Sequence, residues 1–319
     1  MVAPIVTVTM NPAIDLSTST DRVAATEKMR CAQPRTDPGG GGINVARTVL
    51  ALGEPVLAVL PVGGPTGTVL KDLLERAAVP CRIISIDGST RESFSVTDNE
   101  SGRQFRFVLP GPTLTPAEWS RCLDAAIDAA RSAQYVVASG SLPPGVPSNF
   151  YQALATRVAG AGRRFILDTS GEALRQLRHG AYLVKPSARE LAHYVGHPLP
   201  DTDSRITAAR ELITGGVSEL VVVSLGADGA LVVGRDWWET VSATPVAVAN
   251  ATGAGDAMVA GLTVGFTRGL DTLDAMELGI AAASASLVTH GTNPGHPDVI
   301  ANLLDARTTT PAPLSHSGD

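Results

Sequence analysis

Short apolar runs alternate with longer segments of helical pattern along most of this 319-residue chain. The apolar runs, rich in Val, Ile and Leu, predict strands at residues 5–10, 56–62, 135–138, 165–167, 182–184 and 220–224. Helices are expected between them, at residues 44–52, 68–78, 116–133, 148–160, 188–195 and 203–215. This order is typical of βαβ units and predicts an α/β fold with a parallel sheet covered on both faces. In such a sheet, ligands bind at the carboxyl ends of the strands.

The composition excludes several classes of protein. Hydrophobic residues make up 44% of the chain and charged residues 18%, which allows a large core and argues against disorder. The net charge is −6, whereas a general binder of nucleic acid or anionic membrane carries a basic surface. We therefore expect neither nucleic acid nor membrane as a partner. Residues 307–319 are small, polar and proline-containing, which predicts a flexible tail.

The cysteines and the N-terminal residues indicate the cellular compartment of the protein. Cys31, Cys81 and Cys122 are widely spaced and form no C-x-x-C pair, which argues against a disulfide framework or a zinc site and favours a reducing cytoplasm. The first residues lack a basic segment followed by a long apolar core, so no signal peptide is expected. No run of about 18 apolar residues predicts a membrane span.

Three segments have the alternation of exposed strands instead. Residues 14–20 (IDLSTST), 93–97 (SFSVT) and 103–109 (RQFRFVL) alternate apolar and polar side chains, and the turn-prone DNESG joins the last two. The pattern predicts a half-exposed hairpin within a small antiparallel sheet outside the main domain. An exposed sheet face is usually covered by a ligand or a second subunit. A surface hairpin without function is the alternative.

Two glycine-rich segments allow close approach of a ligand. In DPGGGGINVART, residues 37–48, four glycines lead into a helix whose first turn carries Asn44. Backbone amides at such a helix start bind anions and polarised oxygens. The segment is not a dinucleotide fingerprint, because Val45 stands where the third small residue belongs, and the chain has no Gly-Lys pair for a P-loop. The second segment, PVGGPTG at residues 61–67, lies at a strand end. Tight turns alone are the alternative for both.

The strongest candidate for chemistry is NATGAGDAMVAGL, residues 250–262. Gly253, Ala254, Gly255 and Asp256 precede an apolar helix expected at residues 257–266. The free amides of this helix start would form an anion hole, and the Asp256 carboxylate could accept a proton from an attacking hydroxyl. Phosphoryl transfer requires this combination of positioning and charge stabilisation. A helix N-terminus lowers the pKa of a carboxylate, which predicts a weak base. An N-capping aspartate is the alternative.

Three further loops follow predicted strands. In LVKPSARE, Lys185 could contact phosphates and Glu190 could hold Mg²⁺ through water. In VVVSLGADGALVV, Ser224 and Gly226 lie at a strand end suited to a nucleotide. The loop SGSLPPG, which begins at Ser139, is expected to contact substrate. A solvated helix start is the alternative for the first loop, and a plain hairpin for the second.

Taken in order, these motifs resemble a known family. They are NPAID at residues 11–15, GGGGINVAR at 39–47, SGSLPPG at 139–145, LVKPSARE at 183–190, VVVSLGADGA at 221–230 and TGAGDAMVAG at 252–261. Each is weak alone, but the ordered set resembles the ribokinase-like PfkB sugar kinases over nearly the whole chain. The run of four glycines is closer to the ribokinase-type 6-phosphofructokinase branch than to the fructose-1-phosphate and tagatose-6-phosphate kinases, where Gly-Gly-Lys-Gly is expected.

The resemblance implies a three-layer α/β/α domain with a mostly parallel central sheet and a small β-sheet lid. The main domain would comprise residues 1–12, 37–90 and 111–306, and the lid residues 13–36 and 91–110. The resemblance further implies ATP and Mg²⁺, and pairing of two lids in a homodimer. The activity it implies is phosphorylation of fructose 6-phosphate at its C1 hydroxyl, giving fructose 1,6-bisphosphate and ADP.

Site residues follow from the resemblance position by position. Asp256 matches the catalytic base, and the anion hole matches Gly253, Ala254 and Gly255. The residues that match contacts to the sugar phosphate are Asp15, Lys28, Gly40, Gly41, Asn44, Arg91 and Ser139. The residues that match the nucleotide site are Lys185, Ser187, Ser224, Gly226, Gly229 and Ser284. Glu190 matches a magnesium ligand acting through water, and the residues near a monovalent-cation (K⁺) site are Asn250, Thr252 and Ser286.

One departure keeps other functions open. The family's Asn-x-x-Glu metal motif has Ser187 in place of the asparagine, which predicts altered metal affinity. The departure leaves open, as one alternative, a binding or regulatory protein that keeps the pocket without turnover, although the retained Asp256, Gly253 and Gly255 argue against it. A tagatose-6-phosphate or fructose-1-phosphate kinase is the alternative within the family. An NAD-dependent dehydrogenase is disfavoured by the broken fingerprint.

Overall fold

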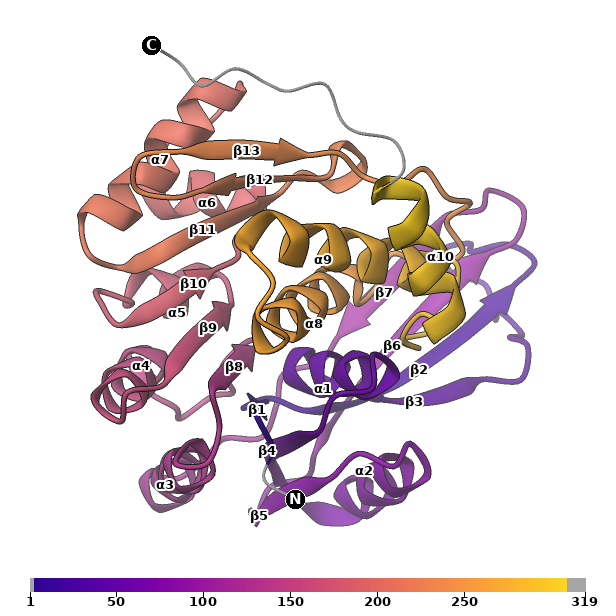
Figure 1. Cartoon of the computed structure of the whole chain (residues 1–319). Coiled ribbons are helices and arrows are strands. Elements are labelled where there is room, and N and C mark those ends of the chain that lie inside the picture. The colour runs from indigo at the N-terminus through magenta and orange to yellow at the C-terminus, as the bar shows by residue number, and fades with distance from the viewer. Residues whose placement is uncertain (1–2, 309–319) are drawn as a thin grey trace.

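A nine-stranded sheet runs through the centre of the computed structural model, which describes residues 3–308 (Figure 1). In spatial order its strands are β13 (Trp238–Val241), β12 (Ala230–Val233), β11 (Ser218–Ser224), β10 (Ala181–Val184), β9 (Arg164–Asp168), β8 (Tyr135–Ser139), β1 (Ile5–Val8), β4 (Val56–Val62) and β5 (Cys81–Ser85). The strands from β5 to β11 are parallel, and β12 and β13 are added antiparallel at one edge. The predicted, mostly parallel sheet is confirmed.

Helices cover both faces of this sheet. One face carries α1 (Gly41–Ala51), α2 (Gly64–Arg76), α8 (Ala254–Thr267), α9 (Thr272–Leu287) and α10 (Pro297–Thr308). The other face carries α3 (Pro116–Ala130), α4 (Phe150–Gly160), α5 (Gly171–Arg175), α6 (Ala188–Val195) and α7 (Thr202–Thr214). Alternate residues of the central strands point into one or the other of the two apolar cores, as a two-sided sheet requires. The three-layer α/β/α fold is therefore confirmed.

A four-stranded sheet lies to one side of the main layers, to the right in Figure 1. Its order is β3 (Arg35–Gly39), β2 (Ala13–Thr20), β6 (Arg91–Asp98) and β7 (Gln104–Val108). The expected hairpin is β6–β7. The expectation of a wholly antiparallel sheet is wrong, because β2 and β6 pair in parallel from Ala13↔Arg91 to Thr20↔Asp98. Each follows a strand of the parallel main sheet, β1 or β5, so the two enter the small sheet in the same direction.

Strand β3, which the alternation did not predict, forms an edge of the small sheet. It contains Pro38, and an edge strand tolerates a residue that lacks an N–H. At the other end of the chain, residues 307 and 308 belong to α10, while the rest of the expected tail lies outside the described residues. Within residues 3–308, no helix has the length and apolar character needed to cross a membrane.

Candidate active site

The first turn of α8 forms the centre of the site. Gly253 caps this helix with a φ of 89°, a left-handed conformation that glycine adopts without strain. The next residues, Ala254 to Asp256, begin the helix, and the first amides of a helix have no partner within it. The predicted Gly-Ala-Gly-Asp segment thus presents free N–H groups at a helix N-terminus, where the macrodipole attracts anions.

Asp256 is held by two side chains from distant parts of the chain. Ser139, at the end of β8, donates its hydroxyl hydrogen bond to Asp256 Oδ1 at 2.8 Å. Asn44 of α1 donates from Nδ2 to Asp256 Oδ2 at 3.0 Å. Burial raises the pKa of the Asp256 carboxyl, and these two hydrogen bonds lower it in part. The expectation of a lowered pKa is therefore wrong, because desolvation of the buried carboxylate outweighs the favourable charge effects.

The start of α1 approaches Asp256 closely. A Cβ atom built on Gly41 would lie 2.1 Å from Ser139 Oγ and 2.9 Å from Asp256 Oδ1. Only glycine therefore fits here without moving the two groups that hold each other. Asn44, one turn further along, leaves its buried Oδ1 without a hydrogen-bond partner among the described residues, so that oxygen can accept a hydrogen bond from a ligand.

Two cavities meet at the first turn of α8. A polar cavity of about 300 Å³ lies on the side of the small sheet and is lined by Asp15, Gly40, Gly41, Asn44, Arg91, Arg106, Ser139, Asp168, Glu190, Gly253 and Asp256, among others. An apolar cavity of about 570 Å³ lies on the other side and is lined by Ala254 and Gly255 together with Ser224, Gly226, Gly229, Ser284 and several aliphatic side chains. The anion-binding turn therefore lies between two separate compartments, each large enough for part of a reacting pair.

Asp168 and Lys185 form a buried ion pair beneath this turn. Lys185 Nζ lies 3.2 Å from Asp168 Oδ1, and their side chains are 5% and 15% exposed. Burial raises the pKa of Asp168 to about 6, with Lys185 opposing and Asp256 adding to the rise. Burial alone would lower the pKa of Lys185, but the Asp168 carboxylate more than offsets this and raises it. A Cβ on Gly255 would lie 3.4 Å from Lys185 Nζ, so this cation lies directly behind the anion hole.

Positive charge also lines the opposite wall of the polar cavity. Arg91, at the start of β6, donates from Nε and Nη2 to the carbonyl of Asn11 at 3.2 and 3.1 Å. Arg106 of β7 lies on the same cavity wall. Burial raises the pKa of Asp15, and both guanidinium groups oppose this rise. Two guanidinium groups beside one carboxylate suit a ligand that carries both a phosphate and hydroxyl groups.

Ser187 and Glu190 form a reciprocal cap at the start of α6. Ser187 N donates to Glu190 Oε2 at 2.7 Å, and Glu190 N donates to Ser187 Oγ at 3.2 Å. The serine therefore acts as the helix cap, while Glu190 remains on the wall of the polar cavity. In the described part of the chain, no three His, Cys, Asp or Glu side chains gather closely enough to hold a metal by themselves.

The structure does not bring every predicted residue to a cavity. Lys28 is exposed in the segment between β2 and β3 and lines neither cavity described above. Ser187 is outside the apolar cavity but pairs with Ser224, which lines it. Two cavity residues, Asp168 and Arg106, were not predicted. Asp168 had a usable signal, because it ends the strand that contains Phe165, Ile166 and Leu167, where ligand-binding groups gather.

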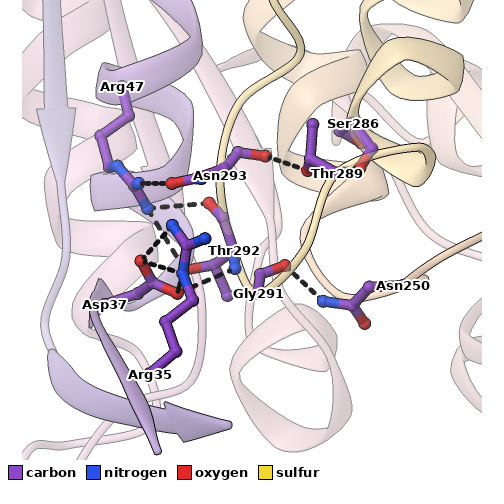
Figure 2. Close-up of polar contacts among 9 residues, drawn as sticks. All are labelled: Arg35, Asp37, Arg47, Asn250, Ser286, Thr289, Gly291, Thr292 and Asn293. Atoms are coloured by element: carbon purple, nitrogen blue, oxygen red, sulfur yellow. Dashed lines mark hydrogen bonds and ion pairs between the residues drawn. The ribbon is translucent and has the colours of Figure 1, made fainter.

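Two of the three residues expected near a monovalent cation, Asn250 and Ser286, lie by the loop between α9 and α10 (Figure 2), and the third, Thr252, contacts Asn250. Asn250 donates from Nδ2 to the carbonyl of Gly291, and its Oδ1 accepts a hydrogen bond from Thr252 N at 3.0 Å. Ser286 donates its hydroxyl to Ala283 O at 2.7 Å. Thr252 lines the polar cavity, whereas Ser286 is buried within α9. The loop is thus bridged by protein side chains to the segment that precedes the anion hole.

Comparison with known proteins identifies the family. The model of the pfkB family of carbohydrate kinases matches residues 8–299. The ATP-dependent 6-phosphofructokinase isozyme 2 of Mycobacterium tuberculosis is 51% identical over 288 residues, which cover 90% of this chain and 85% of that protein. The isozyme 2 of Escherichia coli is 38% identical over 290 residues, with 90% and 94% covered. The crystal structure of the Escherichia coli phosphofructokinase-2 in complex with potassium superposes with a TM-score of 0.90 at 36% identity, covering 96% of this chain and 99% of that one. A helix N-terminus with a buried carboxylate between two cavities, the three-layer fold and these matches lead to one conclusion: the chain belongs to the pfkB family of carbohydrate kinases.

Proposed function

We propose that this protein transfers the terminal phosphate of ATP to the C1 hydroxyl of fructose 6-phosphate, giving fructose 1,6-bisphosphate and ADP. The observation that carries the proposal is the position of Asp256. Asp256 lines the polar cavity together with Gly253, while Ala254 and Gly255 of the same helix turn line the apolar cavity. A proton acceptor and an anion hole at one helix start suit an in-line transfer between two bound reactants.

The nucleotide would occupy the apolar cavity. Aliphatic side chains such as Val246, Met258 and Ile280 suit the flat apolar faces of a purine, and Gly226 and Gly229 leave room beside it. Its phosphates would then extend toward Ala254 and Gly255, where the helix amides and the ammonium of Lys185 favour negative charge. Because Lys185 is paired with Asp168, its charge is fixed in place before any nucleotide binds.

The sugar phosphate would occupy the polar cavity. Arg91 and Arg106 suit the 6-phosphate, and Asp15 and the unpartnered Asn44 Oδ1 suit ring hydroxyl groups. With the phosphate held at the arginines, the far end of the sugar would reach Asp256. The raised pKa of this carboxyl makes it a better proton acceptor than an exposed aspartate, provided that it is ionised at the working pH.

Magnesium suits the carboxylates on the cavity wall. Glu190 uses Oε2 for the helix cap and keeps Oε1, and Asp168 lies on the same wall. Mg²⁺ is typically bound through one or two carboxylates, waters and substrate phosphates, which fits the absence of a complete protein cage among the described residues. When bound, the ion would neutralise charge on the phosphates. Ser187 fits this arrangement because it caps α6 and orients Glu190.

We assign residues 13–36 and 91–110 to a lid and propose that two lids pair in a homodimer. Phe94 and Phe107 stack at 4.8 Å between ring centroids while remaining 38% and 47% exposed. Val108 beside them is 58% exposed. An aromatic pair on an exposed sheet face is a typical contact surface for a second copy. A nucleotide and a sugar phosphate as substrates, and three unpaired cysteines, favour the cytoplasm.

The assay is ADP release coupled to a reporter enzyme, with Mg-ATP and each of fructose 6-phosphate, tagatose 6-phosphate and fructose 1-phosphate. We expect the highest kcat/KM with fructose 6-phosphate. A higher value with either other sugar would assign the chain to the corresponding kinase, and no ADP release with any sugar would support a binding protein without turnover.

The catalytic assignment is tested with Asp256→Asn. The amide keeps the size of the side chain but removes the proton acceptor, so kcat should fall by roughly 10²–10⁴-fold while KM for the sugar changes little. Asp271→Asn serves as the matched control, because Asp271 caps α9 on the surface, away from both cavities. Turnover of Asp256→Asn at the level of this control would refute the assigned role.

A further inference from the structure

The loop between α9 and α10 is joined to three other parts of the chain (Figure 2). Asn250 contacts it from the segment before the anion hole, Arg47 from α1, and Asp37 from β3 of the small sheet. Residues 289–293 therefore connect the segment before the anion hole, α1 and strand β3 of the small sheet. Whatever holds this loop in place also positions the segment that leads to Gly253.

Asn250 forms the first of these connections. Its Oδ1 accepts the Thr252 N–H at 3.0 Å, which fixes the orientation of the amide, since only an oxygen can accept there. The NH₂ group is consequently directed at the carbonyl oxygen of Gly291. One side chain thus bridges residues 250–252 and the loop, and it is 9% exposed.

Arg47 forms the second connection and brings a positive charge. Its Nη1 donates to Thr292 O at 2.8 Å and to Thr292 Oγ1 at 3.2 Å, and its Nη2 donates to Asn293 Oδ1 at 2.7 Å. Burial lowers the pKa of Arg47 from its usual value, with Asp37 opposing, but a guanidinium group remains charged in proteins. Arg47 is 8% exposed, so its guanidinium group is buried against this loop and away from solvent.

Thr289 satisfies further oxygens of the loop. Its Oγ1 lies 2.8 Å from Ser286 O and 2.9 Å from Asn293 O, within reach of donating to either. A potassium ion requires several converging oxygens that are free of hydrogen-bond donors. Here an amide, a guanidinium group and a hydroxyl already approach those oxygens. Arg35 and Arg47 face the carboxylate of Asp37, and Arg47 is also balanced by Asp15, so these groups leave no net negative charge that would attract a cation.

We infer that in this chain the amide of Asn250 and the guanidinium of Arg47 replace a monovalent cation as the bridge between the α9–α10 loop and the anion-hole segment. The expected K⁺ site therefore does not fit these residues. The protein is active and stable without K⁺, and Asn250 is a positioning residue that holds the approach to Gly253. The kinetic consequence depends on the proposed phosphotransfer, whereas the consequence for thermal stability does not.

The first test compares chloride salts of K⁺, Na⁺ and tetramethylammonium at equal ionic strength and constant Mg²⁺. Tetramethylammonium is too large to enter a site between backbone carbonyls. We expect kcat and Tm of the wild-type protein to agree across the three salts. An ion that binds the folded state raises Tm, so a K⁺-specific rise in Tm, or activity about fivefold higher in K⁺, would overturn the inference.

The second test uses Asn250→Ser, which removes the bridging amide and leaves the Gly291 carbonyl without its donor. This variant should melt at a lower temperature than wild type in tetramethylammonium, and K⁺ should restore part of the difference. Its kcat should become K⁺-dependent while KM for the sugar changes less. Asn149→Ser is the matched control, because Asn149 makes no side-chain cap at the start of α4 and lies on the opposite face of the sheet.

The variants distinguish a positioning role from a purely structural one. If Asn250 only stabilised the fold, Asn250→Ser would lose the same Tm in all three salts, and the inference would be refuted. If the proposed activity itself failed, neither wild type nor the two variants would phosphorylate the sugar. A K⁺-specific rise in Tm seen only in Asn250→Ser would still support the bridging role of the Asn250 amide. Asn149→Ser should behave as wild type in every salt.

Discussion

The contact between Gly41 and the Ser139–Asp256 pair gives a sharp test of how closely this site is packed. In Gly41→Ala the new methyl group would lie 2.1 Å from Ser139 Oγ, which must retreat by about 1.3 Å to reach the 3.4 Å at which ordinary contact begins. The 2.8 Å hydrogen bond to Asp256 would then break. A hydrogen bond to a charged group contributes about 1.5–3 kcal/mol, which corresponds to roughly 10- to 100-fold in rate if lost only at the transition state.

The assay is kcat and KM for the sugar phosphate, with Tm as a check on folding. We expect Gly41→Ala to reduce kcat by about 100-fold, because misplacement of a reacting group by about 1 Å has effects of that size. In a Ser139→Ala background the methyl group no longer meets the hydroxyl but still lies 2.9 Å from Asp256 Oδ1 and from the Ser139 backbone carbon, so the same substitution should cost less without becoming neutral. Gly160→Ala is the matched control, since a Cβ there meets nothing within 4 Å. Retained kcat in Gly41→Ala, or effects that simply multiply in the double variant, would refute the reasoning.

Four further predictions concern charge and assembly. The pKa of Asp168 is raised to about 6, so kcat/KM should fall as the pH drops through this region and Asp168 takes up a proton. Asp168→Asn should change that acid limb and leave only the part due to Asp256, whose pKa burial also raises, and an unchanged profile would contradict the role of Asp168. The effect of pH on stability has the opposite sign. Because the pKa of Asp168 is raised in the folded state, this residue stabilises the fold at low pH, and its contribution is lost as the pH rises through about 6. The Tm of Asp168→Asn relative to wild type should therefore improve with rising pH. Arg106→Gln should raise KM for the sugar phosphate by roughly 10- to 100-fold with little change in kcat, as expected for a lost charged contact to phosphate, and an effect on kcat alone would exclude this role. Phe107→Ser should shift the protein from dimer to monomer in sedimentation velocity, whereas wild-type protein that sediments as a monomer would refute lid pairing.

The main fold was largely predictable because its strands are short, apolar and separated by helices. The predicted range 56–62 coincides with β4, and 188–195 with α6. Helix α9 was not predicted, because most of its residues, including a continuous run from Leu278 to Ser286, are buried and its sequence therefore lacks an amphipathic period. The parallel pairing of β2 and β6 was missed for a different reason: strand direction depends on distant connections, which local alternation does not encode.

The candidate site was predicted unevenly. Glycine-rich segments and strand-end motifs located Asp256, Asn44 and Ser139, whose side chains meet in the structure. Arg106 was missed because an arginine on an exposed hairpin resembles any solvated charge until the register is known. The direction of the Asp256 pKa shift was also missed, since desolvation depends on packing by segments more than a hundred residues away.

The parallel partnership of β2 and β6 has a consequence for how the protein is assembled. The two strands are separated by 70 residues that include α1, β4, α2 and β5, so neither can find the other until that portion of the large sheet is in place. Closing so long a loop costs entropy before any contact offsets it. The small sheet should therefore form last, and its amide protons should exchange with solvent through openings that leave the nine-stranded sheet intact. The small sheet beside the polar cavity would then be a late and separately reversible addition to an already folded main domain.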